Sequence, residues 1–333
     1  MVRYVGGIIT TADTDPTTSA SSGVWQIQEA LTNTQGETWQ VPLPPTFGIF
    51  GGNIYGTNKN AISYFSMDST GNASDWGDLT RYDYGLGALG NTTRAAWGGG
   101  ASGATPQNTI DYITWATQGN AADFGDLNKA FTYLAGLSNS TRGVWGGGYD
   151  QSADANNDMQ YITIASTGNA TDFGDLTVAR MQLGGASSPT RGVFSCGKNI
   201  SGSAVNTIDY MTIASTGNAI DFGDATVARQ NLSSGASSTR CVSGGGNSNV
   251  IDYVTIASTG NATDFGDMLS SFGGYATASN NLILVISGGT HFSNRMEQVT
   301  IASTGNATDF GDMVESIAYY HAGTGNYHGG LQS

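Results

Sequence analysis

Paired aspartates are the most frequent chemistry-bearing pattern in this chain of 333 residues. The motif Gly-Asn-Ala-x-Asp-Phe/Trp-Gly-Asp occurs six times and sets two carboxylates three residues apart: Asp75/Asp78, Asp123/Asp126, Asp172/Asp175, Asp221/Asp224, Asp264/Asp267 and Asp309/Asp312. Such pairs can act as general acid and base, or offer the oxygen ligands that Ca²⁺ prefers. Because an enzyme needs one site and this chain has six copies, we interpret the pairs as turn-capping and ion-pairing groups, with repeated Ca²⁺ binding as the alternative.

Basic residues recur at two positions of the same repeat. One set follows a threonine, ahead of a glycine-rich stretch, and the other follows the paired aspartates: Arg94, Arg142, Arg191 and Arg240, and Arg81, Lys129, Arg180 and Arg229. We expect these side chains to form salt bridges with the paired carboxylates, within or between repeats. In the third repeat the predicted scaffold residues are therefore Asp172, Phe173, Asp175 and Arg191.

Histidine and cysteine are too scarce for an evident metal or nucleophilic centre. The three histidines, His291, His321 and His328, all lie in the last 43 residues, and His321 and His328 can become neighbours when the chain closes. Two ligands do not complete a metal site. Cys196 and Cys241 are expected to be buried thiols, with a bridge between neighbouring repeats as the alternative. No hydrolase elbow, P-loop or zinc-protease motif is present, so we predict neither an enzyme nor a cofactor.

Aromatic residues that break the repeat pattern are the best candidates for binding. They are Tyr82, Tyr84, Trp115, Tyr133, Tyr149, Tyr275, Tyr319, Tyr320 and Tyr327. A rigid aromatic face beside polar loops can stack on a sugar ring, and packing is the alternative. From this set we select Trp115, Tyr149, Tyr82 and Tyr84 as possible ligand or partner contacts. The segments expected to carry specificity are the variable loops 53–61, 101–109, 149–158, 198–207 and 290–296.

The spacing of the motif identifies the elements that hold these residues. Successive copies start 48, 49, 49, 43 and 45 residues apart, which favours the blades of a β-propeller. Each unit contains segments typical of four short strands, which in one copy cover residues 183–188, 191–197, 208–214 and 219–224. We expect the turn at 215–218 to use Gly217 and Asn218 for positive φ angles. Small residues suit the inner strand, and the aromatic of each motif should pack between blades.

Closure of the ring follows from where the array starts and stops. It opens in the middle of a unit, near residue 47, and ends with a small-residue stretch after the sixth motif. We therefore predict an all-β, six-bladed propeller over residues 46–333 whose first blade combines strands from both ends, with seven blades as the alternative.

Residues 1–45 carry no repeat and form a predicted attachment arm. A Thr/Ser-rich stretch precedes Val24, Ile27, Gln28 and Leu31, whose spacing favours a short amphipathic helix, and prolines close the segment. An isolated helix this short is marginal in water, so it needs a surface to pack on. That surface is either the propeller or a partner, and we assign attachment to Val24, Trp25, Ile27 and Leu31.

The formal net charge of −14 disfavours nucleic acid and anionic membranes as partners. The first residues lack the apolar stretch of a signal peptide, and no run is long enough for membrane insertion. We expect synthesis in a cytoplasm.

The glycine doublets, the following tyrosines and the arginines resemble Kelch-type blades over residues 47–330. The repeat IDYVTIASTGNATDFGD, starting at Ile251, resembles repeats in virion structural proteins of marine bacteriophages, including cyanophages. Ser22-Gly23-Val24-Trp25 with Glu29, Trp39 and Pro42 is similar to a segment of phage tail and fibre proteins.

The phage resemblance implies a virion protein without enzymatic activity. It would be present in several copies on a tail fibre, tail or capsid surface, would attach to other virion proteins through residues 1–45, and would serve host contact or assembly. The alternatives are a carbohydrate-binding receptor module for host surface glycans, a host-side scaffold, and an enzyme like the copper oxidases that share Kelch propellers.

Overall fold

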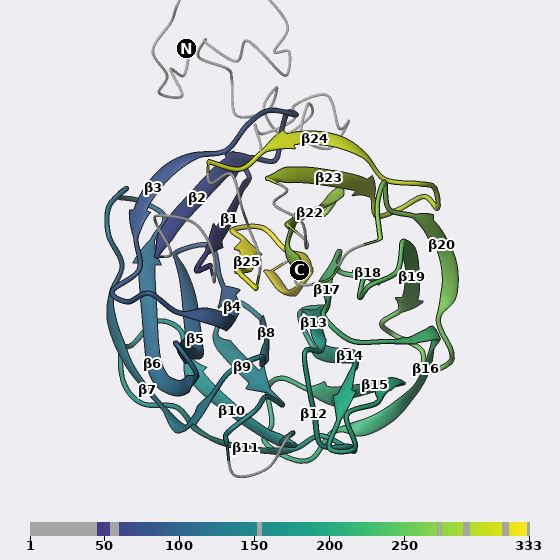
Figure 1. Cartoon of the computed structure of the whole chain (residues 1–333), viewed down its shortest axis with the longest axis horizontal. Coiled ribbons are helices and arrows are strands. Elements are labelled where there is room, and N and C mark those ends of the chain that lie inside the picture. The colour runs from purple at the N-terminus through teal and green to yellow at the C-terminus, as the bar shows by residue number, and fades with distance from the viewer. Residues whose placement is uncertain are drawn as a thin grey trace, which may run out of the picture. The chain divides into compact units, whose positions relative to one another are not determined.

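The computed structural model describes residues 45–53, 60–151, 155–271, 273, 275–288, 294–314 and 320–331. Residues Thr46–Ser333 form one compact unit, in which six antiparallel sheets surround a central axis (Figure 1). The protein is therefore a six-bladed β-propeller, as the repeat spacing predicts, and the seven-bladed alternative is wrong.

Every blade runs from an inner strand at the axis to an outer strand at the rim. Blade 1 is β25 (Ala322–Gly325), β1 (Phe47–Gly51), β2 (Ala61–Ser66) and β3 (Ser74–Asp78). Blade 2 is β4 (Tyr84–Gly90), β5 (Arg94–Ser102), β6 (Thr105–Thr114) and β7 (Ala122–Phe131). Blade 3 is β8 (Ala135–Ser138), β9 (Arg142–Gly146), β10 (Asp158–Thr163) and β11 (Thr171–Asp175).

The other three blades follow the same order. In blade 4, β12 (Arg180–Met181) and β13 (Gly184–Ser187) both pair with β14 (Arg191–Asn199), followed by β15 (Ala204–Thr212) and β16 (Ile220–Arg229). Blade 5 is β17 (Leu232–Ala236), β18 (Arg240–Gly245), β19 (Val250–Thr255) and β20 (Thr263–Asp267). Blade 6 is β21 (Tyr275–Ser279), β22 (Ile283–Gly288), β23 (Arg295–Thr300) and β24 (Thr308–Asp312). A 3-10 turn, η1 (Gly329–Leu331), follows β25.

Blade 1 closes the ring with strands from both ends of the array. Strand β25 pairs antiparallel with β1, with Gly325 opposite Gly48 and Ala322 opposite Gly51. Figure 1 shows the C-terminal end at the centre of the ring beside β25. The predicted two-ended first blade is thus confirmed.

The hydrophobic core lies between the blades. In every blade the register slips by one residue at the aromatic of the paired-aspartate motif, which is a β-bulge: Gly174 faces Met159 while Asp172 faces Gln160, so Phe173 stands between them unpaired. Phe173 is buried in one cluster with Val144 of blade 3 and residues of blade 4. The expected packing of this aromatic between blades is confirmed.

Candidate binding site in the central channel

The repeated motif joins each outer strand to the next blade. Gly217 and Ala219 donate backbone hydrogen bonds to the carbonyls of Phe173 and Asp175 in the preceding blade, at 2.7 and 2.8 Å. Asn218 Oδ1 accepts a hydrogen bond from the Asp175 backbone N–H at 3.1 Å. The same asparagine contact recurs at all six blade junctions. Gly217 has the predicted positive φ, but Asn218 does not, because its side chain caps the neighbouring blade instead.

The arginines of the Thr-Arg positions do not pair with the motif's carboxylates, so that expectation is wrong. Arg191 Nη1 donates to the carbonyls of Ile256 and Ala257 in the next blade, at 3.0 and 2.9 Å. Its guanidinium also lies 4.7 Å from the ring centre of Tyr210. Arg94, Arg142 and Arg240 make equivalent contacts. Backbone carbonyl oxygens and the face of an aromatic ring both attract a cation. Arg191 is held by these groups, and Asp172 of the motif is exposed.

The second basic set does find carboxylates, although not those of the motif. Arg180 pairs with Asp209 at 2.8 Å and Arg229 pairs with Asp252, with all four side chains buried. Burial lowers the pKa of Arg180. Asp209 also accepts hydrogen bonds from Thr177 of the preceding blade. From the sequence, Asp209 was assigned only to a strand. A carboxylate at a core-facing position of an alternating pattern is the feature that could have indicated a buried ion pair.

Three cavities lie end to end along the axis, because adjacent ones share lining residues. Their wall is built from the inner strands, whose small residues allow close approach: a Cβ on Gly136 would collide with the backbone of Ala88 in the neighbouring blade. Hydroxyls fasten these strands to each other. Ser138 donates to the Gly90 carbonyl, and Ser187 donates to the Ser138 carbonyl, each at 2.6 Å. The expected crowding of small residues at the channel is confirmed.

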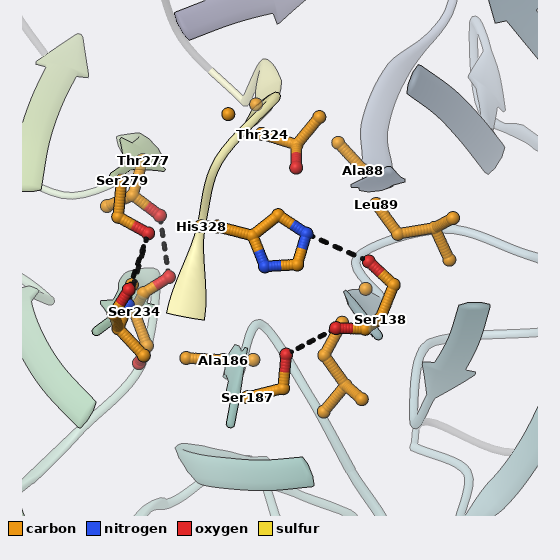
Figure 2. A pocket seen from close by; sticks show the side chains of 17 residues that line it. Ala88, Leu89, Ser138, Ala186, Ser187, Ser234, Thr277, Ser279, Thr324 and His328 are labelled. Atoms are coloured by element: carbon orange, nitrogen blue, oxygen red, sulfur yellow. Dashed lines mark hydrogen bonds between the residues drawn. The ribbon is translucent and has the colours of Figure 1, made fainter. Parts of the chain in front are cut away.

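His328 closes one end of the channel (Figure 2). Its Nδ1 accepts a hydrogen bond from the Gly330 backbone at 3.1 Å, which leaves the proton on Nε2, 2.9 Å from the Gly90 carbonyl and 3.2 Å from Ser138 Oγ. Burial lowers the pKa of His328 to about 4. Since the Ser138 hydroxyl already donates to Gly90, this Ser–His contact supports the wall rather than an activated nucleophile.

A collar of backbone hydrogen bonds forms the other end of the channel, which we call the mouth. Gly85 donates to the Tyr320 carbonyl, Tyr133 to Gly85, Gln182 to Tyr133 and Asn231 to Gln182, over 2.7 to 3.0 Å. Four of them precede the inner strand of their blade, Gly85 is the second residue of β4, and all five have left-handed φ angles between +56° and +67°. Because each comes from a different blade, the collar brings five blades together around one opening, and four of them contribute a side chain there.

Unrepeated side chains gather at this mouth. The rings of Tyr133 and Tyr320 lie 4.8 Å apart, with Tyr84 at 6.0 and 6.5 Å from them. Gln182 Nε2 donates to the Tyr320 hydroxyl at 3.2 Å, whereas its Oε1 and the Oδ1 of Asn231 are buried without a hydrogen-bond partner. The cavity they line is small, with about 50 Å³ of space open to water-sized molecules. Gln182 and Asn231 were not predicted as binding residues from the sequence, because a single amide side chain in a loop forms no distinctive pattern.

The four predicted contact residues take different places. Tyr84 belongs to the mouth, and its hydroxyl donates to the Gly103 carbonyl. Tyr149 pairs with Thr132 beside the collar residue Tyr133, so two of the predicted variable loops reach this end of the channel. Tyr82 is 62% exposed, away from the cavity lining. Trp115 packs edge-on against Trp76 and donates from Nε1 to the Asn91 carbonyl, which fits the packing alternative.

The remaining candidates lie apart or outside the described residues. His321 and His328 are not neighbours, because β25 separates them, and His291 is not described. His321 hydrogen-bonds Ser287 at 2.6 Å, and burial lowers its pKa to about 3. Cys196 and Cys241 are buried free thiols, as predicted, with pKa values raised by burial to about 11 and 12. Val24, Trp25, Ile27 and Leu31 fall outside the described residues.

Within the described ranges, no three histidine, cysteine or acidic side chains are grouped to hold a metal ion. Repeated Ca²⁺ binding at the aspartate pairs stays a prediction. The same part of the chain contains no helix with the length and hydropathy needed to cross a bilayer. Comparisons with protein-family profiles and with curated proteins find no match to this chain.

Proposed function

We propose that this protein is a non-enzymatic structural protein of a bacteriophage virion. In this proposal residues 1–45 attach it to other virion proteins, and the propeller is displayed on a tail fibre, tail or capsid surface in several copies, for host contact or particle assembly. The support is the resemblance of the repeats and of the segment around Trp25 to phage proteins.

A binding role is supported by where the repeated and the unrepeated residues lie. The repeated Asn218, Phe173 and Arg191 and their counterparts are engaged in contacts between blades. The unrepeated tyrosines and amides meet at the mouth instead. A rigid ring that presents variable side chains at one end is suited to recognition.

Immunogold labelling of purified phage particles, with antibody against residues 47–330, tests the virion role. We expect label at one location, and label at the distal tail would assign host contact while label on the capsid would assign decoration. Protein confined to infected cells, with no label on intact particles, would reject the virion role and favour a host-side scaffold.

A carbohydrate-binding receptor module is the second candidate, and the tyrosine cluster at the mouth favours it. Three aromatic rings beside two amide side chains combine a stacking surface with hydrogen-bonding groups. We expect the full-length protein to bind host surface polysaccharide on an array. Binding that survives replacement of the mouth residues would place the glycan site elsewhere.

A further inference from the structure

A buried carboxylate near the mouth occupies the place of a buried cation in other repeats. The position two residues before the collar holds Arg180 and Arg229 in two repeats, and Asp83 in a third. Both arginines are buried and pair with Asp209 and Asp252. A positive charge in two repeats is thus replaced by a negative one at the start of blade 2.

The carboxylate that such an arginine would meet is still present in blade 2. Asp111 corresponds to Asp209, because each lies opposite the first aspartate of its motif and accepts two hydrogen bonds from the threonine that follows the preceding motif. The threonine in blade 2 is Thr80, which donates from its backbone N–H at 2.9 Å and from its hydroxyl at 2.7 Å. Blade 2 therefore has two buried carboxylates where other repeats have an ion pair.

The surroundings of Asp83 compensate its charge only in part. Its side chain is 4% exposed, and its Oδ1 is buried without a hydrogen-bond partner. Arg81 Nε lies 3.4 Å from Oδ2, but the Arg81 side chain is 35% exposed and its Nη1 donates to the Thr109 hydroxyl. A cation that is open to water offsets a buried negative charge weakly.

The other described neighbours add no positive charge. Asp111 on β6 is a like charge, and Asp123 on β7 acts in the same direction on Asp111. Gly100 of β5 and Gly52 after β1 approach the segment closely and carry no charge. Burial first, and the Asp111 carboxylate in addition, raise the pKa of Asp83, and Arg81 does not reverse this.

The segment around Asp83 ties blade 2 to its neighbours. The Asp83 carbonyl accepts a hydrogen bond from the Asn53 N–H after β1 at 3.3 Å. Two residues on, Gly85 donates to the Tyr320 carbonyl and accepts from Tyr133, each at 2.7 Å. A change of charge at Asp83 therefore acts where blades 1, 2 and 3 meet at the mouth.

We propose that Asp83 is a pH-sensitive switch at the mouth of the propeller. As a neutral acid it stays seated in the junction. Its ionisation places a poorly compensated negative charge beside Asp111, and this loosens residues 81–85 together with the collar bonds of Gly85. The inference does not depend on what the protein binds or where it is displayed.

The sign of the response follows from proton binding. In the opened segment Asp83 has the ordinary pKa of 3.8, whereas in the closed segment the pKa is raised. The closed form therefore binds the proton more tightly, and opening becomes more favourable as the pH rises above 3.8. This direction is opposite to that of His328, whose burial lowers its pKa and whose protonation opposes folding.

Hydrogen exchange measured by mass spectrometry on the full-length protein tests the switch. Peptides that cover residues 81–90 are compared between the wild type and Asp83→Asn at pH 4 and at pH 7, so that the intrinsic pH dependence of exchange cancels. We expect the ratio of the wild-type rate to the variant rate to rise at least about fivefold between the two pH values. A ratio that stays constant, or falls toward pH 7, would overturn the proposal.

Asp172→Asn is the matched control, because it removes an exposed carboxylate of the motif. We expect its exchange in the same peptides to equal that of the wild type at both pH values. An effect as large as that of Asp83→Asn would assign the response to overall charge, and the switch would be rejected.

Two further measurements do not depend on the exchange of Asp83→Asn. Arg81→Gln removes the cation that partly offsets Asp83, so the rise of exchange with pH should be steeper than in the wild type; a shallower rise would contradict the assignment. Asp83→Asn should raise the melting temperature at pH 7, because it removes a buried charge. A lower melting temperature at pH 7 would mean that the Arg81 contact outweighs burial, and the switch would be wrong.

Discussion

At the scale of single residues, the arginine that recurs in the Thr-Arg pairs joins two blades by binding backbone carbonyls and the face of an aromatic ring. Arg191 reaches from blade 4 to the Ile256 and Ala257 carbonyls of blade 5, and its guanidinium covers Tyr210 of its own blade. These partners carry only partial charges, so the contact avoids the desolvation cost of a buried ion pair. The residue that ties two blades is therefore independent of the aspartates beside it.

Arg191→Ala should lower the free energy of unfolding by about 2 kcal/mol, because it removes two hydrogen bonds and a cation–aromatic contact. Urea unfolding measures the change. Asp172→Asn is the control, and we expect less than about 0.5 kcal/mol from this exposed side chain. If Asp172→Asn were as costly as Arg191→Ala, an ion pair between them would have to be reinstated.

At the scale of elements, the outer strand of each blade is fastened to the next blade by close backbone contact. At the ring closure Gly71 and Ala73 donate to the carbonyls of Phe310 and Asp312, at 2.9 and 2.8 Å. Gly311 lies between these carbonyls with a φ of +149°. A Cβ at Gly311 would collide with the Gly71 backbone, whereas a Cβ at Gly71 would meet open space. One junction thus contains one glycine with a steric requirement and one without it.

Gly311→Ala should lower the melting temperature clearly, with a cost of about 1 to 3 kcal/mol from backbone strain and a broken junction. Gly71→Ala, at the same junction, should change stability by less than about 0.5 kcal/mol. Differential scanning calorimetry of the two variants compares them directly. Equal destabilisation would mean that steric contact is not what Gly311 provides.

At the scale of the whole molecule, the C-terminal segment contains the buried side chains of His321 and His328 and closes the ring and the channel. His321 precedes β25 and packs edge-on against Phe50 at 5.5 Å. His328 follows β25 and bonds to blades 2 and 3 at the far end of the channel. Burial lowers both pKa values, to about 3 and about 4, from the ordinary value of 6.5. We therefore expect the stability of the closed ring to depend on pH.

The sign of this coupling follows from proton binding. Between pH 6.5 and about 4 the unfolded chain binds a proton at His328 that the folded protein does not, so stability is full above pH 6.5 and falls toward pH 4. His328→Gln should reduce this slope by up to about 1.4 kcal/mol per pH unit. His321→Leu, which inserts the residue found in other blades, should reduce it independently. Urea titrations from pH 4.5 to 8 measure the slopes, and identical slopes in all variants would refute the coupling.

The repeat pattern predicts the propeller and its closure by strands from both ends, and it favours six blades over the seven-bladed alternative. A fixed motif spacing reports local structure, and local strand patterns repeat because each blade meets the same neighbours. It also marked Tyr84, Tyr133 and Tyr320 as residues that break the repeat. These predictions depend only on order along the chain, and the structure confirms the fold.

Which side chains contact each other depends on how the blades pack. Asn218 contacts Asp175 from 43 residues away, and Gln182 contacts Tyr320 from 138 residues away. Neither pairing follows from spacing, because a closed ring brings together residues from different repeats. For the same reason the expected arginine–aspartate pairs were wrong: the choice between a carboxylate and a neighbouring blade's carbonyl depends on geometry that exists only after the blades pack. The sequence thus specifies the repeating unit, and packing of the units around a common axis creates the mouth.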